Sequence, residues 1–238
     1  MSEWAPKRFW KKAEVTEAKD GYEVLLDGRN LRTPAKSALC LPTKVIANLI
    51  ADEWQAQGDK IVPDTMPMTR MANSAVDKVT PQFDLVADIV AAYGETDMLC
   101  YHAKFPTELV ERQAQAWVPF LDWAKTEYDA PLTIAEGVMH VAQPEQSVAN
   151  LRAKVFELTP FELTAFHDLV SISGSLVLGL AAIREHKPAE QIWSVSRLDE
   201  DWQESQWGKD EEATEFAAKK RQGFFEALTF YRGLQSAS

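Results

Sequence analysis

Carboxylate side chains crowd one short stretch near the end of the chain, residues 194–215. This stretch holds eight carboxylates and only two basic side chains, and such a charge favours basic or neutral partners. When the stretch is placed on one helix at about 100° per residue, an apolar face runs from Ile192 to Trp202 and includes Asp199. The side chains that point away from this face are Trp193, Arg197, Glu200, Asp201 and Glu204.

Two features of this outward face exceed what solubility requires. Glu200 and Glu204 are like charges four residues apart, which costs roughly a few tenths of a kcal/mol in an isolated helix. Trp193 is expected to point outward beside them, and aromatic side chains are enriched at the energetic centres of protein interfaces. We interpret the face as a protein-binding surface. The simpler alternative is a solvated helix face on which Arg197 pairs with Asp201.

No other set of residues has a spacing that predicts catalysis, a metal site or a cofactor. The four histidines show no pair at the i, i+4 spacing of helical metal ligands, and the chain has no phosphate-binding loop, no G-x-G-x-x-G and no G-x-S-x-G. Cys100 lies in an apolar context and is expected in the core, and Gly174 and Gly179 are expected to permit close helix packing. We therefore predict no enzyme activity. The alternative that stays open is a small-molecule enzyme with an unrecognised site in the helical domain.

The net charge of −11 excludes several classes of partner. Binding to nucleic acid needs a basic footprint, which this chain lacks, and an anionic membrane surface would repel it. The longest nearly apolar run, Leu169–Ile183, is shorter than the roughly 20 residues of a membrane span and is expected to be a buried helix. Two cysteines without metal or disulfide spacing, and an N-terminus without a targeting pattern, favour the cytoplasm.

The first forty residues have the pattern of a small antiparallel β-meander. Alternating runs at Ala13–Ala18 and Tyr22–Leu26, and a third at Leu31–Thr33, are separated by two Asp-Gly pairs, which favour hairpin turns. Helices are expected to follow at Thr43–Gln57 and Met68–Val79. Further expectations are a helix that begins at Thr80-Pro81 and runs to about residue 93, and a short strand at residues 98–101 that returns to the sheet.

From residue 105 onward the pattern is almost wholly helical. Helices are expected at residues 107–128, 144–158, 160–185, 188–207 and 210–232, with one or two short strands within 132–141. The shift in composition near residue 105 predicts a boundary between an α+β domain, residues 1–104, and a mainly helical domain, residues 105–238. The fold class expected for the whole chain is α+β.

The sequence SRLDEDWQESQWG at residues 196–208 resembles the C-terminal signature of the assembly chaperones that handle the alpha subunit of F-type ATP synthase. Seven further motifs resemble this family in the family's order. They are RFWKKAEV, LLDGRNLRTP, LPTKVIANLIADEWQAQ, MPMTRMANSAVDKV, DMLCYH, ELVERQAQAWVPFLDWA and SISGSLVLGLA. Together they cover nearly the whole chain. The import extension of the mitochondrial members is absent, which indicates a bacterial-type member.

The resemblance implies a function as well as a fold. Members of the family have two domains, a smaller α+β domain and a helical one, and no known catalytic activity or cofactor. The client would be the unassembled alpha subunit, held before it assembles with beta, and the chaperone would be a monomer when free. The functional acidic site of the family corresponds to the carboxylates of SRLDEDWQ, with Glu200 as the first choice. A general scaffold with several partners is the remaining alternative.

Overall fold

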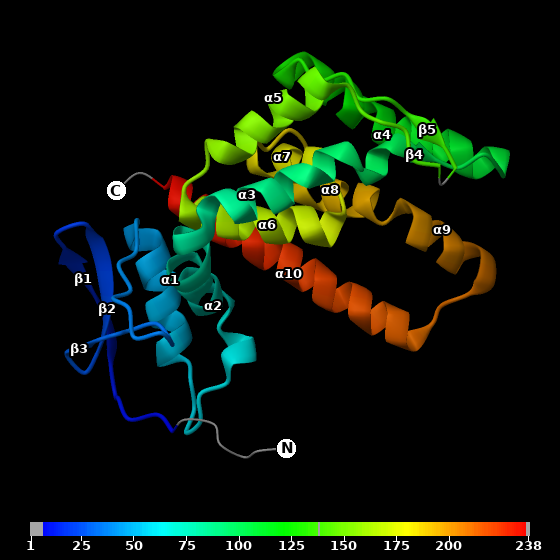
Figure 1. Cartoon of the computed structure of the whole chain (residues 1–238). Helices are drawn as coiled ribbons and strands as arrows, with labels where there is room; N and C mark the ends of the chain where they lie inside the picture. Colours follow the sequence, from blue (N-terminus) through cyan, green and yellow to red (C-terminus); the bar gives the residue numbers. More distant parts are fainter. Residues whose placement is uncertain (1–6, 138, 237–238) are drawn as a thin grey trace. The chain divides into compact units, whose positions relative to one another are not determined.

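The structure, a computed structural model, describes residues 7–137 and 139–236 (Figure 1). Contacts within the chain group it into two units. Among the described residues, the first unit comprises residues 7–83, 159–165 and 229–236, and the second comprises residues 84–137, 139–158 and 166–228. A small antiparallel sheet near the N-terminus and a mainly helical remainder confirm the α+β class. The domain boundary at residue 105 stays a prediction.

The first unit begins with the predicted β-meander. Strands β1 (Ala13–Ala18), β2 (Gly21–Leu26) and β3 (Arg29–Asn30) pair antiparallel in sequence order, with Val15 opposite Val24. The second turn places Asp27 and Gly28 at positive φ, as a tight hairpin turn requires. The third strand lies two residues before its predicted position, because this turn brings Arg29 directly opposite β2.

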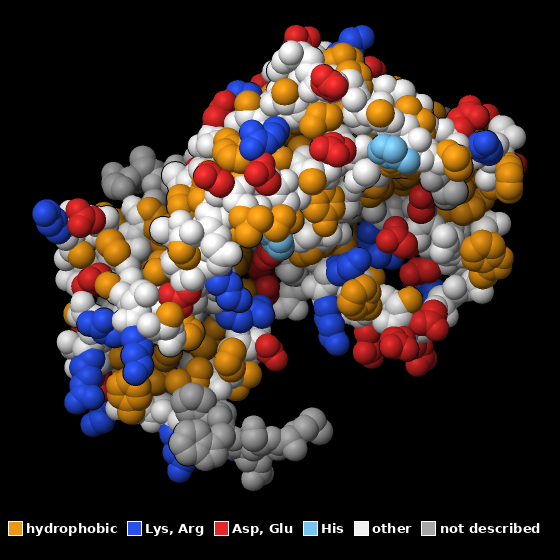
Figure 2. Space-filling view, in the orientation of Figure 1, with side chains coloured by type: hydrophobic (Ala, Val, Ile, Leu, Met, Phe, Trp, Pro, Cys, Tyr) orange, Lys and Arg blue, Asp and Glu red, His pale blue; other side chains and the backbone are white. Residues whose placement is uncertain are grey.

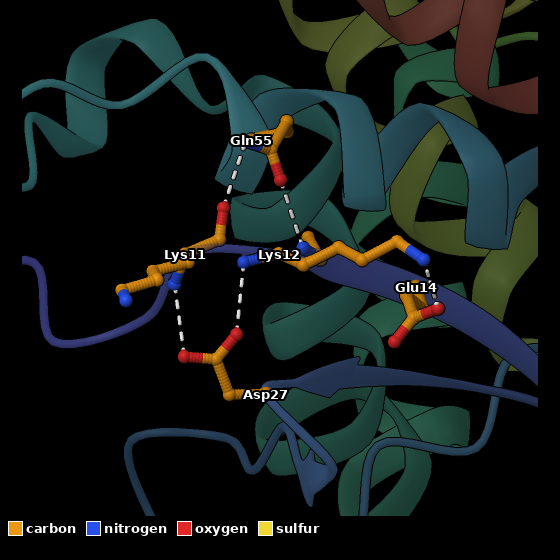
Figure 3. Close-up of polar contacts among 6 residues, drawn as sticks. Lys11, Lys12, Glu14, Asp27 and Gln55 are labelled. Atoms are coloured by element: carbon orange, nitrogen blue, oxygen red, sulfur yellow. Dashed lines mark hydrogen bonds and ion pairs between the residues drawn. The ribbon is translucent and has the colours of Figure 1, made fainter.

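Asp27 also ties the turn to the chain that precedes β1 (Figure 3). Its carboxylate accepts hydrogen bonds from the backbone N–H groups of Lys11 and Lys12, each at 2.9 Å. These N–H donors favour the charged form and lower the pKa of Asp27. The side chain of Gln55 continues the same network, since it accepts from the N–H of Ala13 and donates to the carbonyl of Lys11.

Helix α1 (Lys44–Gln55) packs beside β1 and β2. The hydroxyl of Thr43 caps its first turn by accepting from the N–H of Ile46 at 3.3 Å. Ile46 and Ile50 are fully buried, whereas Val45 on the same helix is exposed. Trp54, near the end of the helix, is half-buried and meets the edge of Trp10 with ring centres 5.0 Å apart.

The remainder of the first unit is helical. A 3₁₀ turn (Pro63–Thr65) leads into α2 (Pro67–Ser74), which widens into a π-type turn (Ala75–Val79) and a 3₁₀ turn (Thr80–Gln82). The predicted helix start at Thr80 is wrong, because its hydroxyl donates back to the carbonyl of Ala75 and the helical path continues. Residues 159–165 supply a reciprocal cap in which Thr159 and Glu162 bond each other's backbone N–H.

The second unit is built from helices and one small parallel sheet. In chain order its elements are α3 (Phe83–Ala91), 3₁₀ turns at Ala92–Glu95 and Met98–Cys100, β4 (Tyr101–His102), α4 (Thr107–Tyr128), β5 (Ala135–Glu136), α5 (Glu145–Phe156), α6 (Pro160–Ser173), α7 (Leu176–Ile183), α8 (Ala189–Ser196), α9 (Leu198–Trp207) and α10 (Glu211–Gln235). Helices α6 and α10 also contribute residues to the first unit. Helix α7 lies against α4 and α8, and its residues from Leu176 to Ala182 are buried.

The predicted strand at residues 98–101 is largely wrong. Residues 98–100 form a 3₁₀ turn, with Cys100 buried as expected, and only Tyr101 and His102 are extended. They pair parallel with β5, which confirms the strand expected within 132–141, and they do not return to the N-terminal sheet. None of the helices in the described part of the chain is long and apolar enough to cross a bilayer.

The predicted helix at 160–185 is broken in two, because Gly174 adopts a left-handed φ of 72° and ends α6. Gly174 is therefore a helix stop and not a packing glycine. Gly179 does serve close packing, since a Cβ built on it would lie 2.5 Å from Val170 Cγ2 and 3.2 Å from Phe166 Cε2. The contact explains why α6 and α7 need glycine at this point.

Gly179→Ala should destabilise the protein by about 1–3 kcal/mol, because the added methyl overpacks a buried contact. Urea unfolding followed by circular dichroism measures this loss. Gly223→Ala is the matched control, because its Cβ would meet only the end of the Ile172 side chain, at 3.2 Å. Equal stability of the two variants would contradict the packing role of Gly179.

The carboxyl group of Asp97 is fully buried beside the start of α7. It accepts from the Ser175 hydroxyl at 2.9 Å and from the N–H of Val177 at 3.0 Å. Burial raises its pKa to about 6, although these hydrogen bonds act in the opposite direction. The unfolded chain, with the lower ordinary pKa, therefore ionises first as the pH rises.

We expect Asp97 to make the protein less stable as the pH rises from about 4 to 6. Its contribution is fully present below the ordinary carboxyl pKa and is lost as the pH passes the folded value, by up to about 3 kcal/mol. Urea unfolding at a series of pH values, compared between the natural protein and Asp97→Asn, isolates this change. Parallel pH profiles for the two proteins would contradict it.

Candidate functional site

The acidic stretch does not form the single helix that its periodicity predicts. Helix α8 ends at Ser196 and α9 begins at Leu198, with Arg197 between them at φ −110° and ψ 9°. The Ser196 hydroxyl donates to the carbonyl of Trp193 at 2.7 Å, a side-chain bond to the backbone that competes with helix continuation. The side chains before and after Arg197 therefore belong to two separate helices, and the faces predicted for one continuous helix do not apply across the break.

Trp193 shows the consequence. It was expected to point outward, but it is only 8% exposed, and its ring lies 5.9 Å from that of Phe224. The prediction is wrong because Trp193 shares the buried face of α8 with Ile192 and Ser196, and this face packs near Phe224 of α10. A role of Trp193 in direct partner contact stays a prediction.

Arg197, at the break between α8 and α9, forms ion pairs with two carboxylates. Its guanidinium lies 3.4 Å from Asp201 and 3.7 Å from Glu204, and its side chain is largely covered. The pKa of Asp201 is raised, because partial burial and the nearby charges of Glu204 and Glu200 together outweigh the opposite effect of Arg197. The pairing of Arg197 with Asp201, which the simpler interpretation of the sequence anticipated, is confirmed.

Asp199 holds α9 against α4. Its carboxylate accepts a hydrogen bond from the amide of Gln113 at 2.7 Å. Gln113 is buried, and its own amide oxygen accepts from the N–H of Ala103 at 2.7 Å. Because both ends of the Gln113 amide are engaged inside the protein, Asp199 positions the acidic helix.

Glu200 differs from its neighbours. It is exposed on the first turn of α9, and within the described residues it makes no hydrogen bond or ion pair. Of the six residues predicted for this site, the structure places Arg197, Asp201 and Glu204 in one ion-pair cluster, Asp199 in a bond to α4, and Trp193 in the core. Of the four carboxylates predicted for this site, Glu200 is thus the one that no hydrogen bond or ion pair among the described residues engages.

Sequence reasoning did not anticipate two exposed aromatic side chains, Trp207 and Phe216. Trp207, at the end of α9, is 79% exposed, and Phe216, near the start of α10, is 59% exposed. Trp207 immediately precedes Gly208, and Phe216 follows it on the second turn of α10. Trp202 is half-buried, with the Arg112 guanidinium 4.9 Å from its ring centre.

The histidines make contacts of a structural kind. His102 is buried against Trp117, His186 stacks on Trp123 with ring centres 4.6 Å apart, and His167 pairs with the adjacent Asp168. The described residues include no group of three or more His, Cys, Asp or Glu side chains that could hold a metal ion. A shallow hollow of about 350 Å³ lies beside α5 and includes His140 and Arg152.

Known proteins similar to this chain share both its sequence and its fold. A sequence model of the family described as ATP12 chaperone protein matches residues 7–125. The mitochondrial protein atp12 of Schizosaccharomyces pombe is 25% identical in an alignment of 225 residues that covers 88% of this chain and 76% of that protein. The crystal structure of Atp12 from Paracoccus denitrificans is 47% identical and superposes with a TM-score of 0.93, covering 96% of this chain and 98% of the other. An aspartate-to-lysine mutant of P. denitrificans Atp12p matches with the same TM-score and identity over 96% of this chain and 97% of the other.

Proposed function

The chain belongs to the ATP12 chaperone family, and on that premise we propose that it binds the unassembled alpha subunit of F-type ATP synthase and prevents its aggregation before assembly with beta. The observation that carries the proposal is the exposed carboxylate face at the start of α9. Glu200 is free there, while Arg197, Asp201 and Glu204 form a charged cluster beside it. A basic or polar surface of the client would meet this face.

The chaperone would act as a passive holder. The sequence has no nucleotide-binding loop, so no ATP-driven cycle is part of the proposal. A passive holder works by mass action: it binds a surface that only the unassembled subunit exposes and loses it to a tighter partner. Beta is the natural competitor, because it covers the same surface of alpha in the assembled head. We place this activity in the cytoplasm and take the free protein to be a monomer.

We expect near-stoichiometric amounts of this protein to suppress aggregation of free alpha without ATP. Light scattering of alpha diluted from denaturant, with and without the chaperone and nucleotide, measures the effect. Gel filtration with the intact catalytic head tests selectivity, since the assembled head should not bind. A strict requirement for ATP, or stable co-elution with the assembled head, would overturn the passive-holder proposal.

A further inference from the structure

Helix α9 and the start of α10 form a segment that contributes few side chains to the core. We call residues 198–219 the acidic arm. None of the residues of α9 is fully buried, and residues 207–216 are all exposed. Yet this exposed stretch carries the large side chains of Trp207 and Phe216. Large exposed aromatic groups away from a core are typical of surfaces that a partner covers.

Phe216 lines a hollow in the surface of the arm. The hollow has a volume of about 520 Å³ and is lined by Asp210, Glu212, Ala213, Glu215, Phe216 and Lys219. The ammonium group of Lys220 lies 5.0 Å from the centre of the Phe216 ring, a distance at which a cation is attracted to the aromatic face. The aromatic ring of Phe216 therefore already accepts one cation and remains 59% exposed.

Charge determines which partner fits this surface. The arm carries eight carboxylates and only two basic residues, Lys209 and Lys219. Figure 2 shows the carboxylates gathered over the connection between α9 and α10, with hydrophobic side chains beside them. A second copy of the chain would bring the same negative arm to a symmetric contact, where like charges repel. Complementarity instead selects a positively charged segment.

We propose that the acidic arm binds a basic, amphipathic segment of the client, whose apolar side chains pack against Trp207 and Phe216 while its lysines and arginines meet the surrounding carboxylates. This inference rests on the proposed function, because it specifies the chemistry of the client segment. It extends the candidate site from the start of α9 to the first turns of α10. Trp207 and Phe216 provide apolar contact area, and the carboxylates make the surface negative, which favours a basic segment.

The test uses the full chain and two synthetic peptides. One is a helical amphipathic peptide of leucine with lysine and arginine, and the other carries glutamate at every basic position. Isothermal titration should show binding of the basic peptide only, weakened by added salt because salt screens exposed charges. In the variant Trp207→Ala/Phe216→Ala the Kd for the basic peptide should rise about tenfold or more.

Two further variants test whether the loss of binding is specific to the acidic arm. Glu212→Lys/Glu215→Lys keeps both aromatic side chains and should also weaken binding, about tenfold or more, through repulsion. Leu85→Ala/Ile89→Ala removes two exposed apolar side chains of α3 and should leave binding unchanged. Circular dichroism and thermal melts confirm that each variant is folded. An equal Kd in natural and arm variants, or an equal loss in the α3 variant, would overturn the inference.

Measurements with purified alpha distinguish this inference from the proposed function. If the natural protein binds alpha and the arm variants bind it equally well, the inference fails and the proposed function stands. If the natural protein does not bind alpha at all, the proposed function fails, while the peptide titration still reports on the arm. Equal binding of the basic and the acidic peptide would show that charge does not select a basic client. Self-association of the natural protein that the arm variants lose would show the same, because the arm would then bind a second copy of the chain.

Discussion

Glu200→Lys should weaken capture of the alpha subunit about a hundredfold while leaving the fold unchanged. Glu200 is exposed and makes no hydrogen bond or ion pair among the described residues, so the substitution breaks no internal contact. A lysine on the first turn of α9 should lower the free energy of unfolding by at most about 1 kcal/mol, because its positive charge opposes the helix dipole there. At the interface, by contrast, attraction becomes repulsion, which typically costs several kcal/mol.

Co-precipitation with alpha, titrated to obtain a Kd, measures this loss, and circular dichroism reports the fold. Asp122→Lys is the matched control, because Asp122 is an exposed carboxylate of the same unit but lies on α4. The control carries the same change in net charge and should bind alpha as the natural protein does. Unaltered binding by Glu200→Lys would remove Glu200 from the site.

Trp117→Ala should lower the free energy of unfolding by about 3–5 kcal/mol. Trp117 is 1% exposed in the middle of α4, and its indole N–H donates to the carbonyl of Val195 at 3.1 Å. Its ring also meets the edge of His102, with centres 5.4 Å apart. The substitution therefore opens a large cavity and removes the bond that holds the end of α8 near the acidic site.

Urea unfolding provides the measurement, and Trp123→Ala provides the comparison. Trp123 belongs to the same helix but is half-buried, stacked on His186. Its removal should cost clearly less, because solvent already covers part of the ring. If both variants lost the same stability, the burial of Trp117 would not be the source of its effect.

Short-range features of this fold follow from residues close together in the chain. The strands at Ala13–Ala18 and Gly21–Leu26 follow from alternation and an Asp-Gly turn, and the Thr43 cap marks the start of α1. Thr159 and Glu162 close their own cap within one turn of helix. Such signals are legible in the sequence because all the atoms involved lie within a few residues of one another.

The break at Arg197 could not be located in this way. The periodicity of residues 192–206 fits one helix, whereas the structure ends α8 at Ser196 and ties Asp199 of α9 to Gln113 of α4. Gln113 lies 86 residues before Asp199, so no local pattern can report their contact. The burial of Trp193 likewise depends on a distant residue, because its ring packs near Phe224 of α10.

The sequence by itself determined the α+β class, most helix positions, the family resemblance and the concentration of carboxylates near Glu200. Only the tertiary structure decided which of those carboxylates are engaged in hydrogen bonds or ion pairs within the protein and which stay exposed. Asp199 is bound to α4, and Asp201 and Glu204 are paired with Arg197, while Glu200 stays exposed within the acidic arm that also presents Trp207 and Phe216. The physical reason is that composition and periodicity describe single helices, whereas exposure depends on which elements distant in the chain pack against each face.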